Sequence, residues 1–430
     1  MPDTPVPVPM NKLTSFCILT TTCLGGVSFL AFNNGFLLAF LARLEMSGSE
    51  ILTLLALPLM VQFVLVMPFG YLSDWFGKKF IGLLGMVFSG LGLFLLTFAG
   101  VAPFQPTRVI IIVGIVSFGV GTAMSHSNWF ALLDPLVTEA TRGRFFGKLR
   151  LTWQGFGVGC FALVALMLER FPELETYRIV LGILALFGFV RMIFFFQIPE
   201  LEQPKPPSEP LWSSLKKVIK LPGYLPFCSY CFLLSLFTAS SPQLFGLLEK
   251  EVLQLSDDQL VMLGNLMVAG ALIGFVVGGN MVDRIGTKYV FLFCHFGYGI
   301  VLLSLLMRGG FPVPVIWVAG FVSTGFGFVQ AASSIAMTSE ILYLIPKENK
   351  SLATGFWLTL WSGGSGLSGV LFGQLLGIGI LSSDWVLFGQ TLSQYDGMLL
   401  LSGGMIMLLT VTLGLIPSVI RVAQWIPQGT

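Results

Sequence analysis

Apolar runs of about 20 residues recur along the whole of this 430-residue chain, separated by short polar segments. A helix of about 20 residues rises about 30 Å, which is the thickness of the hydrocarbon core of a bilayer. Asp, Glu, Lys and Arg make up only 10% of the residues, against about 25% in a soluble domain. Segments of alternating polarity, typical of membrane β-barrels, are absent. The sequence therefore predicts an all-α polytopic membrane protein.

The polar breaks divide the chain into twelve predicted transmembrane helices. The longest break, 199–222, is rich in proline and lysine and lies near the middle of the chain. We expect it to be a linker between an N-terminal six-helix half at 1–198 and a C-terminal six-helix half at 223–430. The helices are expected at 14–43, 51–72, 79–100, 108–134, 148–169, 177–197, 222–247, 259–281, 288–307, 313–341, 351–380 and 396–418.

Lysine and arginine are unevenly distributed among the segments that join these helices. If the N-terminus lies inside, most of them fall on the inner side, as the positive-inside rule requires. We therefore expect both termini and the 199–222 linker to be cytoplasmic. The membrane is expected to be a bacterial inner membrane.

One loop motif occurs twice. Gly70-Tyr-Leu-Ser-Asp74-Trp-Phe-Gly77-Lys78-Lys follows the second predicted helix, and Gly279-Asn-Met-Val-Asp-Arg-Ile-Gly286-Thr-Lys follows the eighth. Gly, Asp, Gly and Lys recur at the same spacing. Two glycines and an acidic residue repeat in the fourth and tenth helices in the same way, as Gly119, Gly121 and Asp134 against Gly325, Gly327 and Glu340.

These loops resemble the Gly-x-Leu-x-Asp-Arg-x-Gly-Arg-Lys signature of the major facilitator superfamily, which the first copy departs from at Trp75 and the second at Thr287. The resemblance implies twelve helices in two pseudo-repeat halves. It also implies rocker-switch alternating access and a solute site between the halves, lined mainly by helices 1, 4, 7 and 10. We expect the signature loops and the arginines after helix 4 to form a cytoplasmic gate, although Asp74 and Lys78 would also suit a plain solvated turn. The expected gating residues are Gly70, Asp74, Gly77, Lys78, Arg142, Arg144, Gly279, Asp283, Arg284 and Gly286.

Polar residues interrupt the first and seventh helices at matching places, with Asn33-Asn34-Gly35 in one and Ser241-Pro242-Gln243 in the other. Such interruptions are the best sequence indication of a transporter's binding site, although amides in a membrane also join helices to one another. Other amides, hydroxyls and tryptophans follow the helices that the resemblance places around the site. The expected substrate-binding residues are Asn33, Asn34, Ser125, His126, Asn128, Trp129, Gln154, Gln243, Gln330, Ser333, Ser334, Trp357 and Trp361.

Amides, hydroxyls and indoles suit a small, largely uncharged organic solute. A dicarboxylate or phosphate fits poorly because no arginine is expected at mid-depth; Arg191 is expected to extend toward the inner interface. Protons and sodium are the candidate coupling ions. His126, Asp134 and Glu340 are the candidate proton carriers, although Asp134 and Glu340 fit a paired gate equally.

The sequence thus predicts a secondary active or facilitative transporter that works as a monomer. Proton-coupled export of drugs or other hydrophobic compounds is the alternative on the same fold, and a non-transporting receptor or scaffold is the alternative of another class. Clustered acid, base, nucleophile or metal groups are absent, and so is a phosphate-binding loop. We therefore expect no enzymatic activity, no cofactor or metal, and no nucleic-acid partner.

Overall fold

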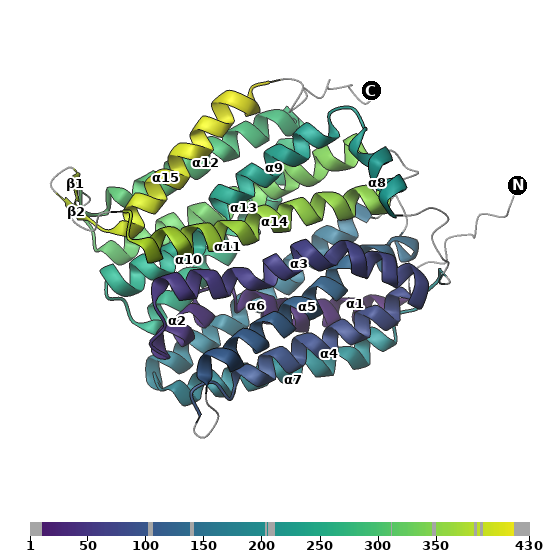
Figure 1. Cartoon of the computed structure of the whole chain (residues 1–430), viewed down its shortest axis with the longest axis horizontal. Helices are drawn as coiled ribbons and strands as arrows, with labels where there is room; N and C mark the ends of the chain where they lie inside the picture. The colour runs from purple at the N-terminus through teal and green to yellow at the C-terminus, as the bar shows by residue number, and fades with distance from the viewer. Residues whose placement is uncertain are drawn as a thin grey trace, which may run out of the picture. The chain divides into compact units, whose positions relative to one another are not determined.

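The computed structural model describes residues 11–101, 106–137, 142–202, 204, 211–310, 312–345, 350–381, 385–387 and 390–416. Long helices account for most of them (Figure 1). The first part of the chain contains α1 (Lys12–Leu30), α2 (Phe36–Arg43), α3 (Gly48–Phe76), α4 (Lys78–Leu96), α5 (Thr107–Leu133), α6 (Arg142–Arg170), α7 (Leu174–Phe196) and α8 (Leu211–Ile219), with a 3₁₀ turn at Asp134–Leu136.

The second part begins with a helix pair, α9 (Tyr224–Thr238) and α10 (Ser241–Leu247), which a π-helical segment at Leu248–Val252 extends. Long helices and one short antiparallel hairpin follow. They are α11 (Asp257–Ile285), α12 (Thr287–Leu306), α13 (Val315–Leu344), α14 (Lys350–Ile378), β1 (Trp385–Leu387), β2 (Gln390–Leu392) and α15 (Gln394–Leu409), with a 3₁₀ turn at Arg308–Gly310 and a π segment at Thr410–Gly414.

The predicted membrane fold is confirmed. Within the described residues, 11 helices are long and apolar enough to cross a membrane. The serine- and glycine-rich helix α14 is not among those 11, but it spans 29 residues and lies where the eleventh of the twelve expected helices was predicted. Two details were not predicted: α8 lies within the 199–222 segment, and the β1–β2 hairpin precedes α15.

The chain divides into two compact units. Unit 1 comprises residues 1–31, 57–160 and 173–213, and unit 2 comprises 32–56, 161–172 and 214–430. Helices α3 and α6 each contribute residues to both units, and in α3 the change falls beside Pro58, which cannot donate a helical hydrogen bond. Segments 32–56 and 161–172 of the N-terminal sequence therefore belong to the same unit as the C-terminal helices.

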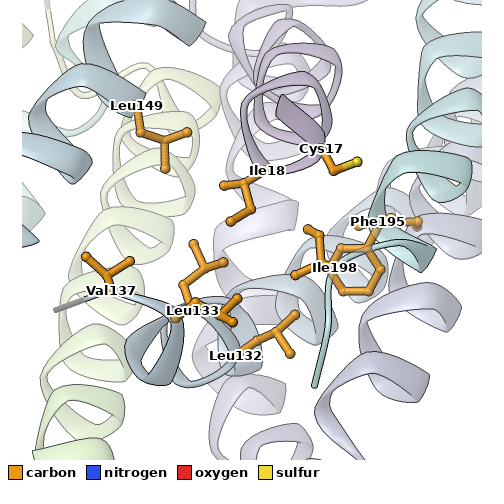
Figure 2. Packing of buried hydrophobic residues seen from close by; sticks show 10 residues of the cluster. Cys17, Ile18, Leu132, Leu133, Val137, Leu149, Phe195 and Ile198 are labelled. Carbon is orange, nitrogen blue, oxygen red and sulfur yellow. The ribbon is translucent and has the colours of Figure 1, made fainter. Parts of the chain in front are cut away.

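A buried apolar cluster holds together one end of unit 1 (Figure 2). Ile18 of α1, Leu133 of α5, Leu149 of α6 and Phe195 of α7 all contribute to it, and each is at most 5% exposed. Four helices that are distant in sequence thus share one core at this end.

Small residues set the distance between neighbouring helices in both units. In unit 2, Gly270, Gly274 and Gly278 follow one face of α11, and a Cβ atom on any of them would overlap the backbone of α13. In unit 1, Gly85 and Gly121 bring α4 and α5 together in the same way. Within a bilayer the hydrophobic effect does not drive helices together, so close packing at small residues supplies much of the attraction.

The repeated loop motif forms the same kind of turn twice. Gly77, the N-cap of α4, has φ +99°, and Gly286, the N-cap of α12, has φ +84°. Residues with a side chain rarely adopt such a conformation. The second glycine of the motif is therefore required by the backbone in both copies, which gives the repeat a structural basis.

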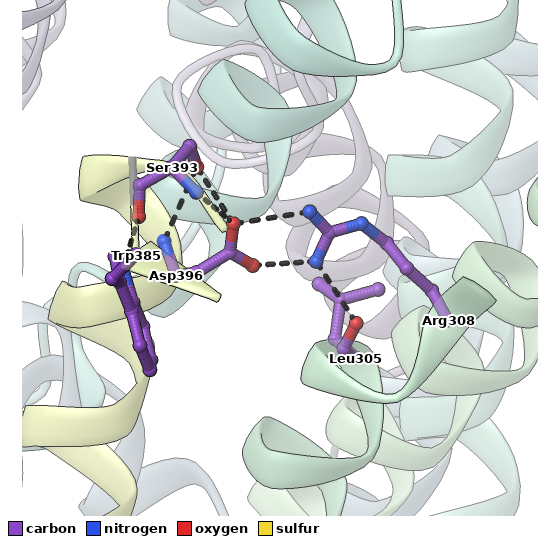
Figure 3. A network of polar contacts seen from close by, with 5 residues as sticks. All are labelled: Leu305, Arg308, Trp385, Ser393 and Asp396. Carbon is purple, nitrogen blue, oxygen red and sulfur yellow. Dashed lines mark hydrogen bonds and ion pairs between the residues drawn. The ribbon is translucent and has the colours of Figure 1, made fainter. Parts of the chain in front are cut away.

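A buried ion pair joins the end of α12 to the beginning of α15 (Figure 3). The Arg308 guanidinium donates to both carboxylate oxygens of Asp396, with N–O distances of 2.5 and 3.0 Å. Asp396 is fully buried, and its Oδ2 also accepts hydrogen bonds from the backbone and side chain of Ser393. Both charges are therefore compensated inside unit 2.

Candidate functional site

The first predicted helix is broken where its polar residues occur. α1 ends at Leu30, and α2 begins after Gly35, whose φ is +82°. The Asn34 Oδ1 accepts a hydrogen bond from the backbone N–H of Phe36 at 3.3 Å. The Asn34 Nδ2 has no hydrogen-bond partner among the described residues, although Asn34 is only 1% exposed. Because buried polar groups in folded proteins are nearly always paired, this amide is a candidate for solute binding.

The seventh predicted helix is broken at the matching place. α9 ends at Thr238, and α10 begins at Ser241 with Pro242 in its first turn. The Ser240 hydroxyl donates to the Oγ of Ser368 on α14 at 2.8 Å. The buried Ser241 Oγ and Gln243 Oε1 have no partner within the described part of the chain. Each break thus contains buried polar atoms that no other described residue satisfies.

An ion-pair network and close backbone contacts hold α2 against α11. Asp257, which is 2% exposed, accepts from the Arg43 Nε at 2.6 Å and forms a second ion pair with Lys250. A Cβ atom at Gly264 would overlap the backbone of Asn34. The second half of the first predicted helix is therefore packed against the eighth predicted helix, within unit 2.

The beginning of α3 is packed against α14 in the same unit. The Ser49 Oγ donates to the carbonyl of Gly373 at 2.7 Å, and a Cβ at Gly369 would come within 2.5 Å of the Ala56 Cβ. The predicted substrate residues Trp357 and Trp361 also lie on α14 and are half-buried. These contacts tie the N-terminal segment 32–56 to the C-terminal helices.

Ser333 lies in a buried network around His295 rather than at an open surface. His295 is 0% exposed; its Nδ1 lies 2.6 Å from the Tyr230 hydroxyl, and its Nε2 lies 3.1 Å from the Ser333 Oγ. Ser334 donates to the carbonyl of Ala331 on the same helix, and Gln330 is half-buried one turn earlier. The network links α9, α12 and α13.

In unit 1, His126 bonds a residue that the sequence analysis did not select. Its Nδ1 lies 3.1 Å from Oε1 of Gln62, and Nε2 of Gln62 donates to the Thr122 Oγ1 at 3.3 Å. Gln62 is 2% exposed, whereas His126 is exposed on α5. The imidazole is therefore held at one nitrogen and accessible at its edge.

The other predicted residues of α5 face its neighbours within unit 1. The Ser125 Oγ lies against Gly85 of α4, so close that a Cβ atom at Gly85 would contact it. The Trp129 ring stacks on the ring of Phe195. Asn128 is 1% exposed and has no partner for either side-chain polar atom among the described residues. On α6, Gln154 is 8% exposed with an unpaired Oε1. Unit 1 thus contains two more unsatisfied amides.

The first gating loop is anchored by a residue from beyond α7. Oε1 of Glu200 accepts from the backbone N–H of Lys78 at 2.7 Å, and the Lys78 side chain forms an ion pair with Glu202. Asp74 is exposed at the end of α3, and Arg144 is exposed near the start of α6. The Arg142 side chain, another of the expected gating residues, is not among those that the structure describes.

The second gating loop differs in its contacts. The Thr287 hydroxyl, at a position where the signature has arginine, donates to Oε2 of Glu340 at 2.9 Å. Glu340 is 4% exposed, whereas its repeat partner Asp134 is exposed. Asp283 and Arg284 are also exposed. The repeat therefore conserves the turn but not the environment of the acidic residue.

Arg191 differs from its expected orientation. Its NH2 nitrogen donates to Oγ of the buried Ser89, in the middle of α4, at 2.8 Å, and the guanidinium lies directly over Gly25 of α1. It therefore extends into the helix bundle of unit 1 rather than toward the inner interface. Gly25 makes this possible because a side chain there would occupy the same space.

A model of the major facilitator superfamily matches residues 18–369. The chain belongs to this superfamily. It is therefore a transporter, not an enzyme. No curated protein matches the chain. Among the described residues, no group of three or more His, Cys, Asp or Glu is arranged to hold a metal ion.

Several solved superfamily structures share the fold. The nucleoside transporter NupG has a TM-score of 0.69 at 14% identity, covering 93% of this chain and 98% of its own. The xylose transporter XylE from E. coli, in a partially occluded inward open conformation, has a TM-score of 0.66 at 15% identity, covering 92% and 96%. A POT family transporter in complex with 5-aminolevulinic acid has a TM-score of 0.71 at 10% identity, covering 92% and 94%. At these identities the likeness establishes the superfamily fold alone.

Sequence reasoning missed several polar residues of this superfamily member. Gln62 could have been found as the only amide in its predicted helix, and Glu200 as an acid directly after helix 6. Glu249 is 4% exposed within the π segment after α10. The partners of Asp257 could not have been found from the sequence. Arg43 is 214 positions away, and Lys250 lies on the segment before α11.

Proposed function

We propose that the chain is a secondary transporter, active or facilitative, which moves a small polar organic solute by rocker-switch alternating access. The observation that carries this proposal is the pair of helix breaks before α2 and α10. Buried polar atoms of Asn34, Ser241 and Gln243 at these breaks have no partner among the described residues. In transporters with internal repeats, discontinuous helices of this kind supply binding groups. Amide and hydroxyl groups bond hydroxylated solutes, and Trp357 and Trp361 offer flat apolar surfaces to such a ligand.

The contacts around Asp257 support alternating access. A transporter of this kind must be able to break the contacts that close one side. Ion pairs of Asp257 with Arg43 and Lys250 hold α2 against α11. Ion pairs exposed to water contribute little net free energy, so such a contact separates more readily than a packed apolar core does. We infer that this network closes the side opposite the 199–222 linker. The loops at Asp74 and Asp283 remain the proposed gate at the linker side, which we place in the cytoplasm together with both termini.

The solute need not be uncharged. The expectation of a largely uncharged solute depended on the absence of arginine at mid-depth, and the Arg191 guanidinium reaches the middle of α4. Proton coupling is carried most simply by His126, whose Nδ1 is held by Gln62 while its edge is accessible. Glu340 is buried and bonded to Thr287, which suits a gate better than a proton path.

Uptake into vesicles containing the purified chain tests the proposal. Pentoses, hexoses, nucleosides, amino acids and hydroxy acids are offered in turn, and we expect saturable uptake of at least one class above that of protein-free vesicles. Asn34→Ala should raise the half-saturating concentration about tenfold, the effect of losing one good hydrogen bond. Gln197→Ala, at an exposed amide, should not change it.

The same vesicles distinguish the alternatives. Uptake only of hydrophobic dyes, driven by an imposed pH gradient, would indicate an exporter of drugs. A folded protein that moves none of these compounds would indicate a receptor or scaffold and would contradict the proposal. If protons are coupled, a pH gradient should drive accumulation, and His126→Gln should abolish accumulation while leaving downhill exchange intact.

A further inference from the structure

A half-buried arginine of unit 1 has no acidic partner among the described residues. Arg191 of α7 makes one hydrogen bond, from NH2 to the Ser89 Oγ. Its Nε is buried and has no partner, and no ion pair joins Arg191 to any Asp or Glu among the described residues. The other arginine of α7, Arg178, is paired with Glu175 and with the carbonyl of Ala99.

The surroundings of Arg191 are shaped to accommodate its side chain. Gly25 of α1 lies under the guanidinium, and Ser28, almost one turn later, donates to the Leu184 carbonyl of α7. Thr21, one turn before Gly25, lies on the same face of α1. Thr21 is 3% exposed, and its hydroxyl has no partner within the described residues. A second unsatisfied polar group thus lies on the helix face that meets α7.

Arg191 itself is half-buried rather than enclosed. His126 of α5, in the same unit, is exposed. The guanidinium also reaches Ser89, halfway along α4, and so lies at a depth where transporters of this architecture bind their substrates.

A charge in the interior of a membrane protein is retained where it has a partner or a function. A guanidinium presents five N–H donors in a planar fork that matches the two oxygens of a carboxylate. One arginine, without a second cation bonded to the same group, balances a single negative charge and not a phosphate dianion. A nearby hydroxyl such as that of Thr21 can donate to the same oxygens.

We propose that Arg191 binds the carboxylate of the transported solute, so that the substrate is a small organic monoanion. This inference rests on the proposed transport function and narrows its substrate class. Arg191 selects for the acid over its uncharged analogue.

The test uses acids and their matching amides. The melting temperature of the purified full-length chain is measured with glucuronate, glucuronamide, lactate, lactamide, formate and, at equal ionic strength, chloride. We expect at least one carboxylate to raise it more than its amide or chloride does. Arg191→Gln should abolish that difference, equivalent to a loss of about tenfold or more in affinity for the acid. Arg178→Gln, on the same helix, should preserve it.

Two results would overturn the inference: no carboxylate stabilises the wild type beyond chloride, or Arg191→Gln responds to acid and amide as the wild type does. If Arg191→Gln does not fold, Arg191→Lys provides the test, because it keeps the charge and loses the fork. Arg191→Lys should reduce the difference in melting temperature between acid and amide. An unchanged difference would contradict the proposed binding of the carboxylate by Arg191.

Vesicle uptake separates this inference from the transport proposal. If an acid binds through Arg191 but is never moved across the membrane, transport fails and the binding role stands. If the chain moves neutral solutes and Arg191→Gln does so equally well, transport stands and the binding role fails.

Discussion

Two arginines, Arg308 buried in unit 2 and Arg191 half-buried in unit 1, have different kinds of partner. Arg308 of unit 2 forms a two-pronged ion pair with Asp396, and that carboxylate is further bonded to Ser393 (Figure 3). Arg191 of unit 1 bonds one neutral hydroxyl, that of Ser89. Burying an ion costs several kcal/mol unless a partner and hydrogen bonds compensate it (roughly 3–5 kcal/mol is lost when one partner is removed). The packing of unit 2 therefore accounts for the charge of Arg308, whereas that of unit 1 does not account for the charge of Arg191.

The same distinction applies to the remaining polar groups. Asp257 has two cationic partners, Arg43 and Lys250. By contrast, both side-chain polar atoms of Asn128 lack partners among the described residues. A polar group whose partners are all supplied by the chain stabilises a conformation, and one that lacks them is available to a ligand. This distinction orders the following predictions.

The largest expected effect is at the compensated arginine. Arg308→Gln leaves the Asp396 carboxylate buried without its cation, and we expect it to lower the free energy of unfolding by about 3–5 kcal/mol. Chemical denaturation in detergent measures this change. The double variant Arg308→Met with Asp396→Leu removes both charges and should recover most of the loss. If Arg308→Gln lowers the free energy of unfolding no more than the double variant does, Arg308 and Asp396 do not compensate each other's charge. The contrast with Arg191 then fails.

An intermediate effect is expected at Asp257, where charges hold a contact that we propose to open during transport. Asp257→Asn removes the negative charge shared by two ion pairs and leaves one acceptor oxygen for the two donors. A hydrogen bond to a charged group contributes about 1.5–3 kcal/mol, so at least one such contribution to the closed arrangement is lost. A cysteine at position 38, where the buried Leu38 side chain packs on Gly246, reports opening in a background without native cysteines. We expect an impermeant maleimide to label it about tenfold faster or more in Asp257→Asn.

A neighbouring acid provides the control for this measurement. Asp258→Asn, one residue later on α11, should label at the wild-type rate, because no ion pair of Asp258 occurs among the described residues. Equal labelling in all three proteins would show that the Asp257 network does not keep this side closed.

The smallest effect is expected at Glu200, which acts at the end of a helix outside the bundle core. Its carboxylate accepts from the backbone N–H groups of Lys78 and Lys79 at the start of α4. Glu200→Gln removes the negative charge and should cost about 0.3–1 kcal/mol, the usual value of a charge at a helix end. Thermal unfolding measures it. If Glu200→Gln lowered the free energy of unfolding as much as Arg308→Gln does, burial and charge pairing would not determine the order of the predicted effects.

The fold could be predicted from composition and repetition. The apolar runs fix the helices, because a bilayer admits few other structures. The glycines at 77 and 286 could be recognised as one motif, and both adopt the positive φ that a shared turn requires. The breaks in the first and seventh predicted helices were visible as Asn33-Asn34-Gly35 and Ser241-Pro242-Gln243, because polar residues and proline within an apolar helix are local signals.

The candidate site was only partly accessible to such reasoning. Asn34 and Gln243 could be selected from sequence, and both carry unsatisfied atoms. Ser333 was selected by the same helical spacing, yet it bonds the fully buried His295 of another helix. Spacing along one helix gives the residues that share a face, but it does not give which neighbouring helix covers that face.

The sequence by itself determined that this protein is a helical membrane transporter with an internal repeat, because hydropathy and spacing act locally along the chain. Only the tertiary structure decided which charges are compensated. Arg308 meets Asp396 across 88 positions, and Arg191 meets Ser89 across 102. Whether a buried cation finds a carboxylate or a neutral hydroxyl depends on which helices pack together and on the space that a residue such as Gly25 leaves. The residues around Arg191, which only the tertiary structure shows, are therefore the reason to propose it as an anion site rather than as an interfacial residue.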